Sequence, residues 1–314
     1  MKRAPFMVPR VHEYLNYRRK CGVELRREGN LLLDFARFVD KTGHTSPVTH
    51  ALAESWARAS NASQINRARR LNIVRRFAKY RLQFDPDTQV PQAGLLGPTT
   101  RRLIPHIYSS QEIEQLLEAA AQLPSKNGLR GATYTALFGL IGAAGLRLSE
   151  ALNLRCSDVN LADGVLTVRR AKHGKMRAVP LHPSTTQALR GYVSLREQKI
   201  PMPANDFFFL SAHGAALDTR TVEYTFGRLR RRLGWVGRGN YPFPRIMDMR
   251  HTFICRRLVS WYQQGTNVDN VILALATYVG HADVTATYWY ITGVPELMSI
   301  ASHRFQRFAG GASK

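Results

Sequence analysis

Residues that could act together on a phosphate group follow one another along the second half of the chain. Arg147 lies in the motif Gly-Leu-Arg-Leu-Ser-Glu, and Arg250 lies in Asp-Met-Arg-His-Thr. His281 follows, and Tyr290 stands nine residues after this histidine. A tyrosine hydroxyl can attack phosphorus, and guanidinium groups bind phosphate oxygens through paired N–H donors. The residue types and their order therefore predict a phosphoryl-transfer site that uses guanidinium groups where other enzymes use a metal ion.

Helices and two strands are expected around these motifs. Apolar residues at helical spacing end at Gly145, and Ser149 is expected to cap a short helix over 150–154. Residues 165–168 and 176–181 read as strands joined by a turn over 171–175. The other helices of this half are expected at 183–198, 219–233, 249–262, 268–278, 283–290 and 295–308.

The first part of the chain predicts a separate helical domain. Residues 1–84 show helical periodicity, whereas 85–106 contain four prolines and little periodicity, which is typical of a linker. Ser109 and Glu112 then form a capping-box signature at the start of the next helix. We therefore expect one domain over 1–104 and a second over 105–314.

The net charge of +23 and the pI near 10.7 indicate a polyanionic partner, most simply nucleic acid. We find no lipidation motif, secretory signal or apolar run long enough to span a bilayer, so a membrane partner is not expected. Cys21, Cys156 and Cys255 are widely spaced, which favours free thiols in a reducing compartment and a cytoplasmic protein. No ligand spacing for a metal or motif for a cofactor is present.

Basic side chains gather in the last helical segment of the first domain. They form either a solvated face or a DNA-contacting face, and we favour DNA contact. Two more candidates for DNA contact lie around the predicted hairpin. The full set is Arg67, Arg69, Arg70, Arg75, Arg76, Lys79, Lys175 and Arg177.

Taken together, the motifs resemble those of the tyrosine recombinase, or phage integrase, family. The resemblance rests on Ala-Gly-Leu-Arg-Leu-Ser-Glu-Ala-Leu from Ala144, Lys172 in a turn before Arg-Ala-Val-Pro-Leu, Arg-His-Thr-Phe from Arg250, and Val-Gly-His-Ala-Asp with Tyr290 nine residues after the histidine. It implies a mainly α fold with a small antiparallel β-sheet. A helical core-binding domain would precede the catalytic domain.

The resemblance also implies a reaction. Tyr290 would attack a DNA phosphodiester, forming a 3′-phosphotyrosyl link and releasing a 5′-hydroxyl, without a metal or cofactor. Arg147 and Arg250 would hold the non-bridging oxygens, and His281 would donate a hydrogen bond to the phosphate. Tyr288 is the alternative nucleophile, disfavoured by its spacing from the histidine.

Two further residues take roles by the same resemblance. Lys172 would protonate the leaving 5′-oxygen, with Lys175 as its rival. Glu150 would orient an arginine of the site.

The chain departs from the family pattern at one position. The family usually has His-x-x-Arg at the second arginine, but residue 247 is methionine. Methionine cannot donate a hydrogen bond, and the loss of one such donor typically costs about 10²–10³ in rate. We expect a slower enzyme, unless Arg245 substitutes. His251 is expected to pack or to cap its helix rather than to react.

The function expected from these motifs is site-specific DNA recombination, as an integrase or transposase of a mobile element. The partners would be double-stranded DNA and further subunits, assembling as a dimer and then a tetramer, either of this chain alone or with related recombinases. The 295–308 helix would pack either on a neighbouring subunit or within its own subunit. The alternatives are a DNA-binding accessory subunit without activity and a type IB topoisomerase.

Overall fold

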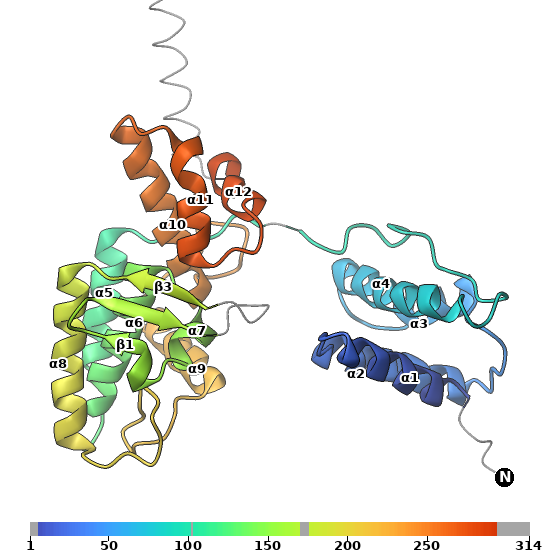
Figure 1. Ribbon diagram of the computed structural model, residues 1–314, viewed down its shortest axis with the longest axis horizontal. Coiled ribbons are helices and arrows are strands. Elements are labelled where there is room, and N and C mark those ends of the chain that lie inside the picture. Colours follow the sequence, from blue (N-terminus) through green and yellow to red (C-terminus); the bar gives the residue numbers. More distant parts are fainter. Residues whose placement is uncertain (1–5, 102, 170–175, 294–314) are drawn as a thin grey trace, which may run out of the picture. The chain divides into compact units, whose positions relative to one another are not determined.

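The computed structural model describes residues 6–101, 103–169 and 176–293 (Figure 1). It divides into two compact units, unit 1 over 1–102 and unit 2 over 103–314. The described residues are mainly helical, with one three-stranded antiparallel sheet. The fold class expected from the sequence is therefore confirmed. The C-terminal helix expected at 295–308 lies outside the described residues.

Unit 1 is built from helices that share one apolar core. Phe35, Trp56 and Phe77 are fully buried in it and come from three different helices. The start of the first helix is capped by a residue distant in the sequence, because the Asp40 carboxylate accepts the backbone N–H groups of residues 6, 7 and 8 at 2.7–3.2 Å. The helices are α1 (Met7–Lys20), α2 (Arg26–Lys41), α3 (His50–Arg58) and α4 (Gln64–Arg81).

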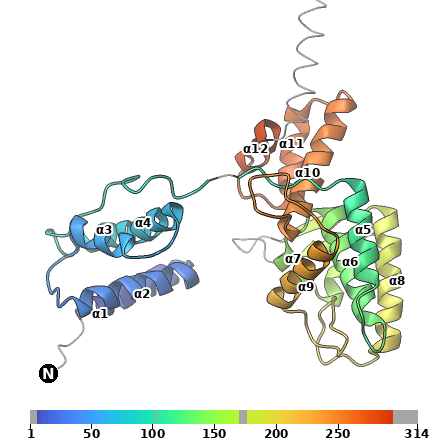
Figure 2. The same cartoon turned by 180° about the vertical axis from the view of Figure 1, so that it is seen from behind.

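Unit 2 is organised around helix α6 (Leu129–Ala144), which packs against α5, α8 and α10. Figure 2 shows α5, α6 and α8 as neighbours, with α10, α11 and α12 gathered at one end of the unit. The expected capping box at Ser109 and Glu112 starts α5. The remaining helices are α5 (Ser110–Ala121), α7 (Leu148–Leu152), α8 (Pro183–Lys199), α9 (Thr219–Arg232), α10 (Ile246–Gln263), α11 (Val268–Val279) and α12 (Thr285–Gly293).

The sheet has the order β1-β2-β3 with antiparallel neighbours. β2 (Val165–Val168) and β3 (Arg177–Pro180) are the two expected strands, in a register that pairs Val168 with Arg177. β1 (Val159–Asn160) was not expected, and at two residues it is too short for a sequence pattern to reveal. The turn between β2 and β3, which holds Lys172 and Lys175, lies outside the described residues.

Three helix starts differ from the sequence expectation: α12 begins at Thr285 and not at 283, and the starts of α7 and α10 differ for a shared reason. α7 begins at Leu148 and not at Glu150, and α10 begins at Ile246, so Arg250 lies in the second turn of its helix. In both cases the acid three residues after an arginine accepts the backbone N–H of that arginine. Arg147 and Arg245 thus occupy N-cap positions, which are usually taken by Ser, Thr, Asp or Asn.

None of the helices within the described ranges is long and apolar enough to cross a membrane.

We predict that Asp40→Ala destabilises the protein by about 1–2 kcal/mol, because three helix-start N–H groups lose their acceptor together. Denaturant unfolding of the full chain would measure this. Glu24→Ala is the matched control, since Glu24 makes an exposed ion pair with Arg26 and its removal should change stability by less than about 0.5 kcal/mol. Equal effects of the two substitutions would contradict the capping role of Asp40.

Candidate active site

Two glycines in left-handed conformation end the helices that lead into the site. Gly145 follows α6 with φ 62°, and Gly280 follows α11 with φ 69°. A Cβ at either position would come within 2.5 Å of a side-chain atom, Phe253 at Gly145 and the Arg177 guanidinium at Gly280. Only glycine therefore fits both the backbone geometry and the space. The expected stop at Gly145 is present.

The carbonyl groups at these helix ends hold Arg250. Its guanidinium donates to Gly145 O at 2.8 Å and to Val279 O at 2.6 Å, and the residue is 2% exposed. Burial, together with the nearby charge of Arg147, lowers the pKa of Arg250 to about 10. The side chain therefore keeps its charge at neutral pH. The two accepting carbonyls fix its direction.

Arg147 and Arg177 share the carboxylate of Glu150. Arg147 donates to Oε1 at 2.7 Å and also to Gly280 O at 3.0 Å, whereas Arg177 donates to both carboxylate oxygens at 3.0 and 2.9 Å. Burial by itself would raise the pKa of Glu150, but the hydrogen bonds and charges of the two arginines outweigh it and lower the pKa to about 2. Glu150 is thus an anion that orders two arginines.

Arg177 does not have the geometry expected of a DNA contact. Its guanidinium is buried against Glu150 and also donates to Tyr278 O at 2.8 Å. β3 is anchored to α7 and α11 through this side chain. The sequence analysis named Arg177 as a candidate for DNA contact, because the position of Glu150 next to β3 depends on tertiary structure and cannot be read from the sequence.

His281 lies between the arginines and α12. Its backbone N–H donates to Ala276 O, and its ring Nδ1 is 2.7 Å from Thr287 Oγ1. Burial, followed by the charges of Arg250 and Arg147, lowers the pKa of His281 to about 3. The imidazole is therefore neutral at physiological pH and keeps a fixed orientation.

Tyr290 reaches the same cluster from α12. The residue is 3% exposed, and its ring lies parallel to that of His281, with 6.3 Å between the centroids. Tyr288, the alternative nucleophile, is on the exposed side of α12, where its hydroxyl donates to Asp269 Oδ1 at 3.1 Å. The structure thus brings Tyr290, His281, Arg147 and Arg250 together and turns Tyr288 away.

One residue of this cluster was not expected from the sequence. His251 Nδ1 lies 2.6 Å from the Tyr290 hydroxyl oxygen, whereas the sequence had suggested a packing or capping role for this histidine. Its position beside Arg250 offered a weak signal. The contact joins residues 39 positions apart, and only the packing of α12 on α10 brings them together.

Comparisons with known proteins agree with this geometry. The model of the phage integrase family matches residues 107–295. The chain belongs to the phage integrase family. It is 42% identical over 302 residues to the putative integrase/recombinase y4rB of Sinorhizobium fredii, covering 95% of this chain and 96% of that protein. It is 30% identical to the tyrosine recombinase XerC of Chromobacterium violaceum over 243 residues, covering 76% and 73%.

Solved structures share the fold. The Tn1549 transposon integrase in complex with circular intermediate DNA aligns with a TM-score of 0.68 at 18% identity, covering 96% of this chain and 99% of that one. The XerH site-specific recombinase bound to its difH substrate aligns with a TM-score of 0.66 at 17% identity, covering 89% and 79%. The family expected from the motifs is confirmed, and with it the enzyme class: a tyrosine recombinase, which cleaves and rejoins DNA.

The departure of this family member at residue 247 is visible in the structure. The Met247 side chain is 42% exposed at the start of α10. Arg245 does not take the place of the usual histidine, because its guanidinium pairs with Asp248 at 2.6 Å and covers the ring of Tyr241 at 3.2 Å. The charge of Arg245 is therefore already paired at the start of α10.

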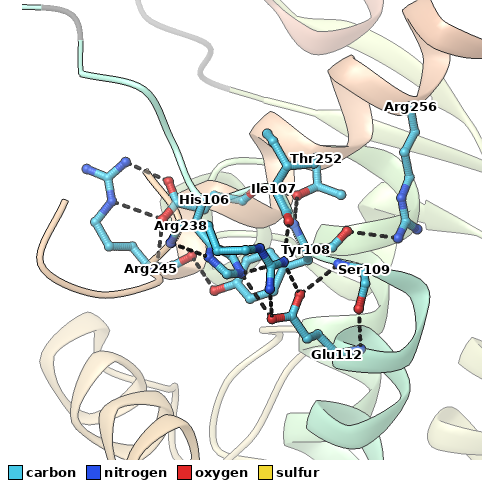
Figure 3. Close-up of polar contacts among 10 residues, drawn as sticks. His106, Ile107, Tyr108, Ser109, Glu112, Arg238, Arg245, Thr252 and Arg256 are labelled. Carbon is cyan, nitrogen blue, oxygen red and sulfur yellow. Dashed lines mark hydrogen bonds and ion pairs between the residues drawn. The ribbon is translucent and has the colours of Figure 1, made fainter. Parts of the chain in front are cut away.

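Helix α10, which carries Arg250 and His251, is held by the chain that enters unit 2. Figure 3 shows Tyr108 donating its hydroxyl to Arg245 O at 3.0 Å and its backbone N–H to Thr252 Oγ1 at 2.9 Å. Arg238 fixes this segment by donating to Glu112 and to Ile107 O. The segment therefore supports the helix from which two residues of the site project.

The basic residues of α4 divide into two groups. Arg69, Arg76 and Lys79 are exposed, whereas Arg70 lies over the ring of Trp56 at 3.8 Å. Arg67 and Arg75 are half-buried, and Arg67 donates to Ser60 O. Lys172 and Lys175 are outside the part of the chain that the structure describes. Within that part no group of three or more His, Cys, Asp or Glu side chains could hold a metal ion.

We predict that Glu150 gives the protein a stability that depends on pH. Its pKa in the folded state is about 2, below the ordinary value of 4.5 for the unfolded chain. The stabilisation, of the order of 3 kcal/mol, is therefore complete above about pH 4.5 and disappears as the pH falls toward 2.

Denaturant unfolding between pH 2 and 6 would compare the wild type with Glu150→Gln. The variant should be less stable at pH 6, because buried arginines lose their counter-ion, and its stability should change less over this range. Glu197→Gln, on the exposed side of α8, serves as the control. If the wild type and Glu150→Gln lose stability in parallel, the ion pairs of Glu150 are not formed in solution.

Proposed function

We propose that Tyr290 is the nucleophile of a site-specific DNA recombinase, and that Arg147 and Arg250 hold the phosphate it attacks. The observation that carries this proposal is the common location of the four groups: Tyr290 and His281 stack, and the helix-end carbonyls next to His281 hold both arginines. Unlike a lysine, a guanidinium presents two parallel donors to phosphate and does not lose its proton at neutral pH.

The chemistry follows from the residue types. The Tyr290 oxygen forms a bond to phosphorus, the bond to the 5′-oxygen breaks, and the phosphate ester is kept as a tyrosyl link that a 5′-hydroxyl can later reverse. Arg147 and Arg250 stabilise the charge on the non-bridging oxygens. His281 donates a hydrogen bond to the phosphate from the ring nitrogen that does not face Thr287. Glu150 and Arg177 keep Arg147 in place.

We also propose Lys172 as the acid that protonates the leaving 5′-oxygen, with Lys175 as the alternative. DNA is the partner that the net charge of +23 favours, and the exposed Arg69, Arg76 and Lys79 of α4 are proposed to contact its phosphates. The three free cysteines suit a reducing compartment, so the proposed location is the cytoplasm.

The proposed assembly is a dimer on each DNA site and a tetramer between two sites. The support comes from relatives: a lambda integrase structure with the same fold is a dimer bound to a core site. Recombination also requires more than one strand to be cut and rejoined. Relatives named as transposon integrase and integrase/recombinase favour integration or transposition over topoisomerase activity.

We predict that Tyr290→Phe abolishes the covalent protein–DNA adduct and leaves DNA binding unchanged, because only the nucleophilic oxygen is removed. The measurement is a denaturing gel of protein incubated with a radiolabelled cognate site. Tyr288→Phe is the matched control on the same helix and should form the adduct at the wild-type level. An adduct that persists in Tyr290→Phe rules out this nucleophile. A wild-type protein that binds its site but forms no adduct supports the accessory-subunit alternative.

We predict that replacing the leaving 5′-oxygen by sulfur restores cleavage in a Lys172→Ala variant, since a thiolate leaves without being protonated. Lys172→Ala should cleave the 5′-sulfur substrate much faster than the ordinary 5′-oxygen substrate. For Lys175→Ala the two cleavage rates should differ little. The reverse pattern would assign the acid to Lys175.

A further inference from the structure

The reaction requires an acceptor for the tyrosine proton, and the family's usual histidine is absent at position 247. A neutral phenol is a weak nucleophile, so a base within hydrogen-bond reach of the hydroxyl assists its attack. His251 is able to take a proton and makes a direct contact, with Nδ1 at 2.6 Å from the Tyr290 oxygen. Met247 cannot accept a proton.

We propose that His251 is the general base that receives the Tyr290 proton on Nδ1 when the tyrosine attacks DNA. The proposal deepens the function proposed above and rests on Tyr290 being the nucleophile. In this step the bond from the tyrosine oxygen to phosphorus forms and the bond from phosphorus to the 5′-oxygen breaks. The proton of the tyrosine moves to Nδ1, and the 5′-oxygen leaves as a hydroxyl with a proton from the lysine acid proposed above. In the rejoining step the imidazolium returns this proton to the tyrosine.

The surroundings of His251 favour the neutral imidazole that this role needs. Burial is the main cause that lowers its pKa, to about 4; Asp248 opposes the shift, and Arg245 and Arg250 add to it. The ring is packed against Trp289 and Tyr290 of α12, and His281 lies near it with its own pKa lowered. A base that is neutral at working pH has a lone pair available at Nδ1.

His281 is less well placed for the same task. Its Nδ1 faces Thr287 Oγ1 at 2.7 Å, whereas Nδ1 of His251 faces the Tyr290 oxygen at 2.6 Å. We therefore assign the two histidines different roles: His251 contacts the nucleophile, and His281 is available to the phosphate.

A purely orienting hydrogen bond is the alternative, and two substitutions separate it from proton transfer. His251→Asn places an amide oxygen near the position of Nδ1, so it can accept the hydrogen bond but cannot take the proton. His251→Phe keeps the ring volume and loses the acceptor. His213→Gln, at an exposed histidine of unit 2, is the matched control.

The experiment measures single-turnover formation of the covalent adduct on a cognate site from pH 6 to pH 9, with DNA binding measured in parallel. Both His251 variants should bind DNA as the wild type does and cleave about 10²–10⁴ times more slowly at pH 7. Their rates should rise steeply with pH, because hydroxide must then remove the proton, whereas the wild-type rate should change little. His213→Gln should match the wild type.

A substrate with a 5′-sulfur leaving group provides a second readout. It removes the need for an acid but not for a base, so it should leave the His251→Asn defect in place. Cleavage by His251→Asn at the wild-type rate, or its rescue by the sulfur substrate, overturns the proposal. A wild-type protein that forms no adduct, or an adduct that survives in Tyr290→Phe, instead refutes the proposed function on which it rests.

Discussion

A single buried carboxylate allows the arginines of the site to exist side by side. Arg147, Arg177 and Arg250 would repel one another in an interior of low dielectric, and Glu150 is the anion that offsets them. The carboxylate is itself fixed in place, because the backbone N–H of Arg147 and three guanidinium N–H groups donate to it. Arg147 and Arg250 lie together at the helix ends, and Arg177 ties the sheet to the helices. Every later feature of the site depends on this arrangement.

The second constraint comes from helix ends. α6 and α11 stop at glycines, and the carbonyl groups of Gly145, Val279 and Gly280 converge on Arg147 and Arg250. Carbonyl groups at a helix C-terminus lack helical partners and carry partial negative charge, so they suit guanidinium donors. Gly145 and Gly280 thus help to bind the arginines directly. Each supplies the conformation that turns the carbonyl toward the cation and leaves room beside it.

Sequence reasoning succeeded where a local rule decides the structure. The stop at Gly145, the capping box of Ser109 and Glu112, and the pairing of two neighbouring strands each follow from short-range preferences. It failed where a long-range contact changes the meaning of a residue. Arg177 was expected to contact DNA, but β3 places it against Glu150. His251 was expected to pack or to cap its helix, but α12 places a tyrosine hydroxyl against it. The arginine N-caps were missed because the acid at the third helical position, and not the cap residue, carries the signal.

Burial, with the positive charges of nearby arginines adding to it, keeps the two histidines of the site neutral. Burial is the main cause that lowers the pKa of both imidazoles; Arg250 and Arg147 add to the shift at His281, and Arg245 and Arg250 add to it at His251. A DNA phosphodiester between the arginines would bring one negative charge into this field and oppose the effect. Proton affinity at both imidazoles should therefore rise when the scissile phosphate is bound. If His251 is the base proposed above, it should accept the Tyr290 proton more readily when DNA is bound than in the free protein.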